Sequence, residues 1–455
     1  MSLQFITGNS GNGKTKYLFN RIVKEAKANP RDNYLVIVPE QFTMQTQRQL
    51  VDLSENKAIM NIDVLSFKRL AYRVFDELGI TNLTVLEETG KNLVLRKLAA
   101  QEADKLGVIG RNLNRIGYIS EVKSLLSELV QYNISPEELG RYIASGRLSD
   151  TLSDKLKDVL VLYEAFEKFM QDKYITAEEI LNVLSNVAEE SAILRNSVIA
   201  FDEFTGFTPI QNQLIKKLFV ISKKIYVTLT IDCREDIFKS RGMQELFDMP
   251  KRTVKSLTEM AAFYGIEVEE PIILDKNYRL AENEELSFME QQLFRKRRCS
   301  FKKAPKHIHI DCLRDPKQEL TKIARRINEL VRNENLRYRD IAIVTGDVNI
   351  YAGYVREIFD KYNIPYFIDA TQEILFHPFI EFIRSIPDIA AQNFSADAVF
   401  RFLRCGFSEL LDSEIDVLEN YVLACGVRGK SAWDKKWVRL PKHKAGYDIE
   451  LLNQS

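Results

Sequence analysis

The stretch that decides the fold is GNSGNGKT, which runs from Gly8 to Thr15 near the start of the chain. It fits the pattern G-x-x-x-x-G-K-[ST] of a phosphate-binding loop. An apolar segment, Leu3 to Ile6, precedes it, and an amphipathic stretch with Leu18, Ile22 and Ala26 on one face follows it. The motif requires this strand–loop–helix setting, so the sequence predicts an α/β domain with a phosphate site at its first turn.

The residue types of this loop suit a polyphosphate. Glycines let backbone N–H groups turn inward, and the N-terminus of the following helix adds partial positive charge. We expect Lys14 to reach the β- and γ-phosphates and the Thr15 hydroxyl to ligate Mg²⁺. The nucleotide-binding residues expected in the loop are Gly8, Gly11, Asn12, Gly13, Lys14 and Thr15. The alternative is a glycine-rich turn that contains a lysine by chance.

The composition is that of an ordinary globular protein with several domains. The 455 residues exceed what one core normally holds, which predicts roughly two to four domains. Lysine plus arginine equals aspartate plus glutamate, at 64 each. This balance excludes a globally basic nucleic-acid coat but leaves room for a local basic groove.

Targeting and redox signals point to the cytoplasm. No apolar run approaches the roughly 20 residues of a membrane span, and the chain enters its first strand without a signal peptide. The five cysteines are scattered without a C-x-x-C pair, and there are four histidines. We therefore expect reduced thiols, neither a zinc site nor a histidine-rich metal site, and no membrane partner.

Alternation of short apolar runs with helical runs predicts a parallel sheet covered by helices. In the first block the expected strands are Tyr34–Val38, Ala58–Leu65, Ser197–Phe201 and Ile225–Leu229. Between residues 81 and 190 only helical periodicity is present, which predicts a helical insertion. In a second block the expected strands are residues 308–312, 341–345 and 365–369, and from about residue 376 the pattern is helical again.

An acid pair follows one of the expected strands directly. Asp202 and Glu203 come straight after Ser197–Phe201. A carboxylate at the carboxyl end of a strand beside a phosphate loop can hold Mg²⁺ through water, which is the role expected of Asp202. Glu203 can orient or deprotonate an attacking water. The alternative is a pair of acidic residues in an ordinary turn.

Two segments extend this pattern to a known superfamily. The run FDEFTGFTPIQ, Phe201 to Gln211, resembles motif II of superfamily 1A helicases. Asn277-Tyr278-Arg279 resembles their motif IV, whose arginine contacts the γ-phosphate, so the resemblance makes Arg279 a candidate catalytic residue beside Glu203. Residues 339–343 (RDIAI) and 364–366 (IPY) resemble the second RecA-like domain of the same superfamily.

Further segments narrow the resemblance to one family. The runs VPEQFTMQTQRQL (38–50), DVLSFKRLAYRVF (63–75) and HPFIEFIRSI (377–386), together with the Asp202 run, resemble the AddB family, the second subunit of bacterial AddAB helicase–nucleases. The resemblance covers essentially the whole chain. It implies ATP and Mg²⁺ as cofactors, an AddA-type helicase subunit and DNA as partners, and a part in double-strand-break repair with recognition of the Chi sequence.

The resemblance also implies a domain plan. Residues 1–80 and 191–290 are expected to form a RecA-like P-loop domain (1A), with residues 81–190 as its helical insertion (1B). Residues 291–375 are expected to begin a second RecA-like domain (2A), and residues 376–455 a truncated second helical insertion (2B).

The chain departs from active motors of the superfamily at several positions. Seven residues before Gly8 leave no room for the adenine-reading glutamine motif. The strand before motif III is followed by Ile231-Asp232-Cys233-Arg234-Glu235 instead of Gly-Asp-x-x-Gln, and Gly206 stands where motif II carries a second aspartate. The phosphate clamp is thus intact while the coupling elements are not, which matches a family that places its motor in AddA.

The end of the chain departs as well. Motifs V and VI are not recognisable, and neither a nuclease acid cluster nor the spacing of a four-cysteine iron–sulfur cluster is visible. We therefore expect an N-terminal fragment, with the cluster only in the C-terminal part of the family. Two other functions stay open: an autonomous superfamily 1A DNA translocase, and a small-molecule P-loop kinase, which no acceptor site supports.

Two basic or aromatic segments could contact nucleic acid. The run RKRRCSFKKAPK, residues 295–306, reads as a phosphate-binding strip or as a solvated linker, and we favour the linker. Trp433 and Trp437 in WDKKW could stack on bases, or pack a helical subdomain, which we favour.

Overall fold

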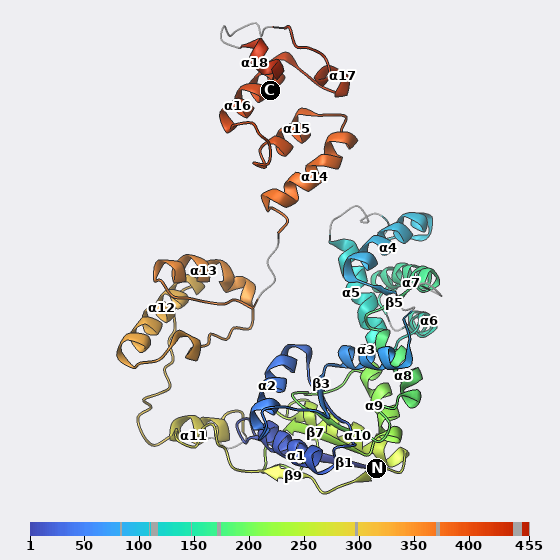
Figure 1. Cartoon of the computed structure of the whole chain (residues 1–455), viewed down its shortest axis with the longest axis vertical. Coiled ribbons are helices and arrows are strands. Elements are labelled where there is room, and N and C mark those ends of the chain that lie inside the picture. Colours follow the sequence, from blue (N-terminus) through green and yellow to red (C-terminus); the bar gives the residue numbers. More distant parts are fainter. Residues whose placement is uncertain are drawn as a thin grey trace. The chain divides into compact units, whose positions relative to one another are not determined.

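The computed structural model describes residues 1–81, 84–108, 110, 117–146, 148–170, 174–295, 299–369, 374–439 and 448–454. These residues form two compact units, Met1–His309 and Ile310–Ser455 (Figure 1). Each unit is described by itself.

The first unit is built on a sheet in which every strand pairing is parallel, with the order β3-β2-β6-β7-β1-β8 and with β9 also pairing with β1. The strands are β1 (Ser2–Gly8), β2 (Tyr34–Ile37), β3 (Ile62–Leu65), β6 (Val198–Phe201), β7 (Lys224–Thr230), β8 (Glu267–Val268) and β9 (Ile272–Leu274). The predicted α/β class with a parallel sheet is confirmed.

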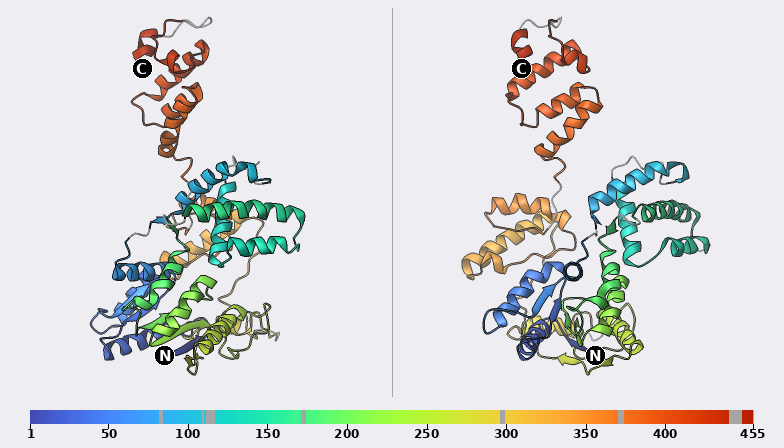
Figure 2. Two further views of the ribbon diagram at one scale, coloured as in Figure 1. Left: turned by 90° about the vertical axis from the view of Figure 1, so that its right-hand side faces the viewer. Right: turned by 45° about the vertical axis from the view of Figure 1, so that its right-hand side comes forward.

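Helices cover both faces of this sheet (Figure 2). Successive strand residues point to opposite faces. Tyr34 and Val36 therefore pack with α1 (Lys14–Ala28) and α2 (Thr43–Leu53), whereas Leu35 and Ile37 pack on the opposite side. That opposite side is covered by α3 (Phe67–Leu78), α8 (Ile180–Val187), α9 (Pro209–Ile221) and α10 (Asp248–Phe263). The unit also contains α11 (Glu284–Gln292).

One predicted strand is shorter than expected. The prediction began at Ala58, but β3 begins at Ile62. Residues before it form a turn in which the Ser54 hydroxyl donates to the Ala58 carbonyl, and the Met60 side chain is 97% exposed. An apolar residue in a turn has the same letter as one in a strand, so the pattern alone placed the boundary too early.

The helical insertion has a core of its own. It is formed by α4 (Glu88–Gln101), α5 (Tyr118–Gln131), α6 (Pro136–Ala144) and α7 (Asp150–Met170). The helical prediction is confirmed, but it missed a short parallel ladder between β4 (Val85–Leu86) and β5 (Ile175–Thr176). A two-residue strand is too short to leave an alternating pattern in the sequence.

The second unit contains two separate helical clusters. In the first, α12 (Pro316–Asn333) packs on α13 (Val348–Lys361). The second cluster contains α14 (Pro378–Ala391), α15 (Ala396–Leu403), α16 (Asp412–Cys425), α17 (Lys430–Trp433) and α18 (Ile449–Gln454). Here the indole N–H of Trp433 donates to the Phe394 carbonyl, and Trp437 stacks on Tyr421 at 5.2 Å between ring centroids. Both tryptophans therefore contribute to packing.

The predicted strands of the second unit are wrong. Within the described part of that unit, residues 310–312, 341–345 and 365–369 form no strand, and neither do residues 308 and 309 just before it. The side chains of Ile310, Val344 and Phe367 are 93%, 93% and 89% exposed. A strand needs hydrogen-bonded neighbours, and these segments have the apolar letters of strands without such neighbours.

Within the described residues, none of the helices combines the length and the apolar character needed to cross a membrane.

Candidate nucleotide-binding site

The loop between β1 and α1 is shaped by glycine. Gly11 and Gly13 have φ angles of +89° and +79°, in the left-handed region that glycine adopts without strain. The Lys14 ammonium lies inside the loop and donates to the carbonyl oxygens of Gly8 at 3.1 Å and Asn9 at 3.0 Å. Burial lowers the pKa of Lys14 below its ordinary value, against the attraction of Glu203 and Asp202.

The acid pair lies beside this loop. The parallel sheet brings the carboxyl ends of β1 and β6 to the same edge, and Asp202 and Glu203 follow β6 directly. The Thr15 hydroxyl lies 3.3 Å from Asp202 Oδ1 and 3.3 Å from Glu203 Oε1. A hydroxyl carries one proton, so it donates to one carboxylate at a time. Residues 187 and 188 positions apart in the chain thus meet at one point.

Asp202 has one carboxylate oxygen that is satisfied and one that is not. Its side chain is buried, and Oδ1 accepts a hydrogen bond from the Thr228 hydroxyl of β7. Among the described residues, Oδ2 has no hydrogen-bond partner. Burial raises the pKa of Asp202, against the hydrogen bond from Thr228. A buried carboxylate oxygen without a partner next to a threonine hydroxyl is a donor set that fits a hard cation such as Mg²⁺.

The segment around Asn277 lies over the loop. The backbone N–H groups of Tyr278 and Arg279 donate to the Gly11 carbonyl at 3.0 and 3.4 Å, and the Asn277 side-chain amide donates to the Ser10 carbonyl at 3.0 Å. A Cβ atom at Gly11 would come within 2.8 Å of both Arg279 Cβ and Asn277 Oδ1. Glycine at this position therefore permits both the turn and the close approach of the covering segment.

These elements enclose a pocket of about 710 Å³. The sequence-predicted residues that line it are Gly11, Gly13, Lys14, Thr15, Asp202, Glu203 and Arg279. Gly8 and Asn12 do not line it. The backbone of Gly8 packs against Leu274, and the Asn12 amide donates to the Leu274 carbonyl at 2.6 Å. Both shape the loop from behind.

Sequence reasoning missed Thr228 and Asn9. Thr228 lies on the same sheet face as Tyr226, which packs with α1, so its hydroxyl reaches Asp202 from the intervening strand. The Asn9 side chain accepts from the Cys233 N–H at 2.9 Å and donates to Glu290 at 2.6 Å. A threonine in a strand and an asparagine in a turn are the commonest choices for those positions, so neither carries a signal by itself.

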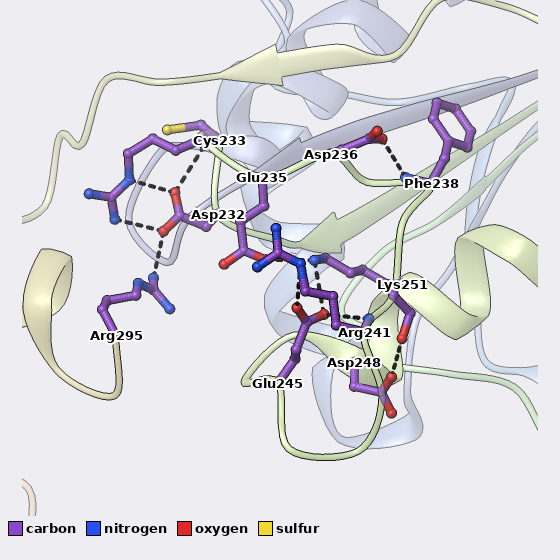
Figure 3. Close-up of polar contacts among 12 residues, drawn as sticks. Asp232, Cys233, Glu235, Asp236, Phe238, Arg241, Glu245, Asp248, Lys251 and Arg295 are labelled. Carbon is purple, nitrogen blue, oxygen red and sulfur yellow. Dashed lines mark hydrogen bonds and ion pairs between the residues drawn. The ribbon is translucent and has the colours of Figure 1, made fainter. Parts of the chain in front are cut away.

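The segment after β7 is held by charges (Figure 3). Asp232 is buried and forms ion pairs with Arg234 at 2.6 Å and Arg295 at 2.7 Å. Glu235 pairs with the buried Lys251 at 2.7 Å, and it is not among the described residues that line the pocket. Arg295 is therefore neither a phosphate-binding residue nor part of a solvated linker. Residues 296–298 of the same basic run lie outside the described residues.

A second pocket, of about 640 Å³, lies at the carboxyl ends of β2 and β3. Its lining residues are Val38, Pro39, Glu40, Ser66, Phe67, Lys68, Arg69, Tyr72, Phe204 and Gln211. Ser66 caps α3 by accepting from the Arg69 N–H, and its hydroxyl donates to Glu40. Gln211 completes a capping box with Thr208 at the start of α9.

Fold and site together define an α/β protein in which a glycine-rich phosphate loop faces a buried acid pair. The chain belongs to the family described as ADDB, N-terminal, whose model matches residues 5–290.

Similar proteins carry one recurring name. The chain is 39% identical to an ATP-dependent helicase/deoxyribonuclease subunit from Lachnoclostridium phytofermentans, over 99% of this chain and 40% of that protein. It is 34% identical to the protein of the same name from Clostridium tetani, over 96% of this chain and 38% of that protein. For the one from Clostridioides difficile the identity is 33%, over 99% and 39%. The chain thus spans well under half the length of these relatives.

Proposed function

We propose that this chain is the nucleotide- and DNA-binding N-terminal part of an AddB-type subunit. The subunit would pair with an AddA-type helicase subunit in a cytoplasmic ATP-dependent helicase/exonuclease that processes DNA double-strand breaks for homologous recombination and responds to Chi. Family membership and the names of the relatives support this assignment. The observation that carries the nucleotide part is the meeting of Lys14, Thr15 and Asp202 at one pocket.

Each residue of the pocket has a role that its chemistry allows. Lys14 would bind the β- and γ-phosphates, and the loop glycines would present backbone N–H groups to them. Thr15 and Asp202 would hold Mg²⁺, which when bound neutralises phosphate charge. Glu203 would orient or deprotonate a water, and Arg279 would contact the γ-phosphate. Whether these two roles lead to turnover depends on the coupling elements, which differ from those of motors.

The surroundings of Glu235 support a subunit that is largely not a motor. This residue takes the position of the glutamine that senses the γ-phosphate in superfamily 1A motors. Here its carboxylate is engaged by Lys251. An ion pair to a buried lysine holds the side chain away from a ligand, so hydrolysis at the pocket would not be transmitted by this route.

We further propose the domain plan that the resemblance implies. Residues 1–80 and 191–290 would form a RecA-like domain 1A, residues 81–190 insertion 1B, residues 291–375 the start of domain 2A, and residues 376–455 the truncated insertion 2B. The strands from the first two ranges that join into one parallel sheet support the first part. The family's iron–sulfur cluster would belong to the C-terminal part of the full-length protein.

The second pocket supports contact with single-stranded DNA. Phe67, Tyr72 and Phe204 are aromatic residues on which bases could stack, and Lys68 and Arg69 supply positive charge at the same opening. The Ser66-Phe67 pair also stands at the position where related helicases touch DNA. A plain helix cap explains Ser66 equally well, so the aromatic residues carry this part of the proposal.

The experiment that tests the nucleotide site is calorimetric titration of ATP with Mg²⁺ into the chain and its Lys14→Ala variant. We expect the variant to lose measurable binding, because the buried ammonium is the positive group closest to the expected phosphates. Lys24→Ala, on an exposed turn of the same helix, is the matched control and should bind normally. ATP affinity that survives Lys14→Ala would refute the assigned clamp.

DNA-stimulated ATP turnover distinguishes this proposal from an autonomous translocase. We expect the isolated chain to show little or none. Brisk turnover that rises with added single-stranded DNA would favour the translocase.

A further inference from the structure

Asn9 connects three parts of the first unit. Its side chain is 5% exposed. The amide oxygen accepts from the Cys233 N–H at the end of β7, and the amide nitrogen donates to Glu290 on α11 at 2.6 Å. Its backbone carbonyl accepts from the Lys14 ammonium at 3.0 Å. The position of one loop carbonyl is thus fixed by a side chain that α11 holds.

The docking of α11 is reinforced next to this contact. Arg295, just past the helix, pairs with the buried Asp232 at 2.7 Å, and its guanidinium lies 5.0 Å from the centroid of the Phe247 ring. Figure 3 shows this arginine reaching Asp232 from a separate segment of the chain. Arg234, the other partner of Asp232, donates to the Gln291 carbonyl at 3.3 Å. Two side-chain contacts and one backbone contact therefore tie residues 290–295 to the loop and to the end of β7.

The arrangement positions the ammonium of Lys14. An ammonium has three N–H donors. Two of them are used by the carbonyls of Gly8 and Asn9, and the third remains for a ligand. Groups that are held in place before a ligand arrives bind it more tightly, because less ordering accompanies binding.

We propose that Asn9 is a positioning residue for Lys14, and that the docking of α11 through Glu290 and nucleotide binding at the loop favour each other. This inference rests on the proposed nucleotide site. Linkage requires the coupling to be reciprocal: nucleotide strengthens the docking of α11 by the same factor by which docking raises nucleotide affinity.

The test combines calorimetry with amide hydrogen exchange on the whole chain. Glu290→Ala removes the acceptor of the Asn9 amide, and we expect nucleotide affinity to fall by about fivefold or more, at the lower end of typical couplings. Glu290→Gln keeps an acceptor oxygen and should bind within about twofold of the wild type. Glu282→Ala, an exposed carboxylate just before α11, is the control and should bind as the wild type does.

Hydrogen exchange separates positioning from a purely structural role. In the wild type, nucleotide should slow amide exchange across residues 284–292, and in Glu290→Ala it should not. Unchanged affinity in Glu290→Ala, or exchange of α11 that ignores nucleotide while the wild type binds it, would overturn the coupling alone. A wild type that binds no nucleotide would overturn both this inference and the proposed nucleotide site.

Discussion

Asp202 is a carboxylate whose charge depends on a single neighbouring hydroxyl. Burial favours its neutral form, and the hydrogen bond from Thr228 favours the ionised form that a cation needs. Because burial holds its pKa above the ordinary value, affinity for a Mg²⁺–nucleotide complex should fall as the pH drops through that raised pKa. The strand between the loop and the acid pair therefore takes part in the chemistry of the site.

Thr228→Val tests this dependence. Removing the donor should raise the pKa of Asp202 further, so the loss of affinity begins at a higher pH. A hydrogen bond to a charged group contributes about 1.5–3 kcal/mol, which corresponds to roughly tenfold or more in affinity near neutral pH. Thr228→Ser keeps the hydroxyl and should behave as the wild type. Calorimetric affinities from acid to alkaline pH decide the matter, and overlapping curves for Val and wild type would contradict the assignment.

The site residues that could be predicted are those whose identity is the signal. Lys14 and Thr15 are prescribed by the spacing of the loop motif, and Asp202 by its place after an apolar strand. Thr228 could not be predicted in the same way. Its direction depends on the pleat of β7, and its partner depends on β7 lying between β1 and β6, a neighbourhood that no local pattern encodes.

At the scale of elements, the helical insertion is organised around a buried lysine. Lys91 of α4 is 2% exposed and pairs with Glu178 at 2.7 Å and with Glu88 at 3.0 Å. Burial alone would raise the pKa of Glu178, but the hydrogen bonds from Lys91 outweigh it and leave the pKa below its ordinary value. These contacts join α4 to the segment between β5 and α8.

Lys91→Met should destabilise the insertion by about 3–5 kcal/mol, since it leaves Glu178 without its buried partner. The sign with pH follows from the lowered pKa: the contribution of Glu178 is present above its ordinary value of 4.5 and is lost as the pH falls below it. Lys105→Met removes a lysine that is 69% exposed in its pair with Glu102, and should change stability little. Thermal unfolding followed by circular dichroism measures both, and equal melting of the two variants would contradict the assignment.

Helix ends could be predicted better than strand ends. Ser66 was expected to begin a helix and does cap α3, because a serine hydroxyl that accepts a backbone N–H is a local interaction. The strand before it was placed too early, since the difference between a strand and an apolar turn depends on a partner strand far away in sequence.

At the scale of the whole molecule, the two units differ in how completely their apolar segments are paired. The first unit pairs its strands into one sheet, whereas residues 341–345 and 365–369 of the second have strand-like sequences and no ladder. One side of these segments packs, as Ile341 and Ile364 do against the core of α12 and α13, and the other side is exposed. Local sequence predicted them as strands because it reports the tendency and not the partner.

Amide hydrogen exchange on the 455-residue chain should reveal this difference. We expect residues 341–345 and 365–369 to exchange quickly, because their backbone N–H groups lack ladder partners, while β1 and β7 should be the slowest to exchange. The two sets can be read from the same peptide map by mass spectrometry. Protection of 341–345 equal to that of β7 would show that these residues pair in solution.

The strand order has a geometric consequence for the ligand. Neighbouring strands lie roughly 4.8 Å apart, so inserting β7 between β1 and β6 sets the ends of those two strands roughly 9–10 Å from each other. That width accommodates a phosphate group and a cation side by side. Were the two strands adjacent, the loop and the carboxylate would meet directly and leave no room for either. The middle strand therefore works as a spacer that matches the protein to the size of what it is proposed to hold.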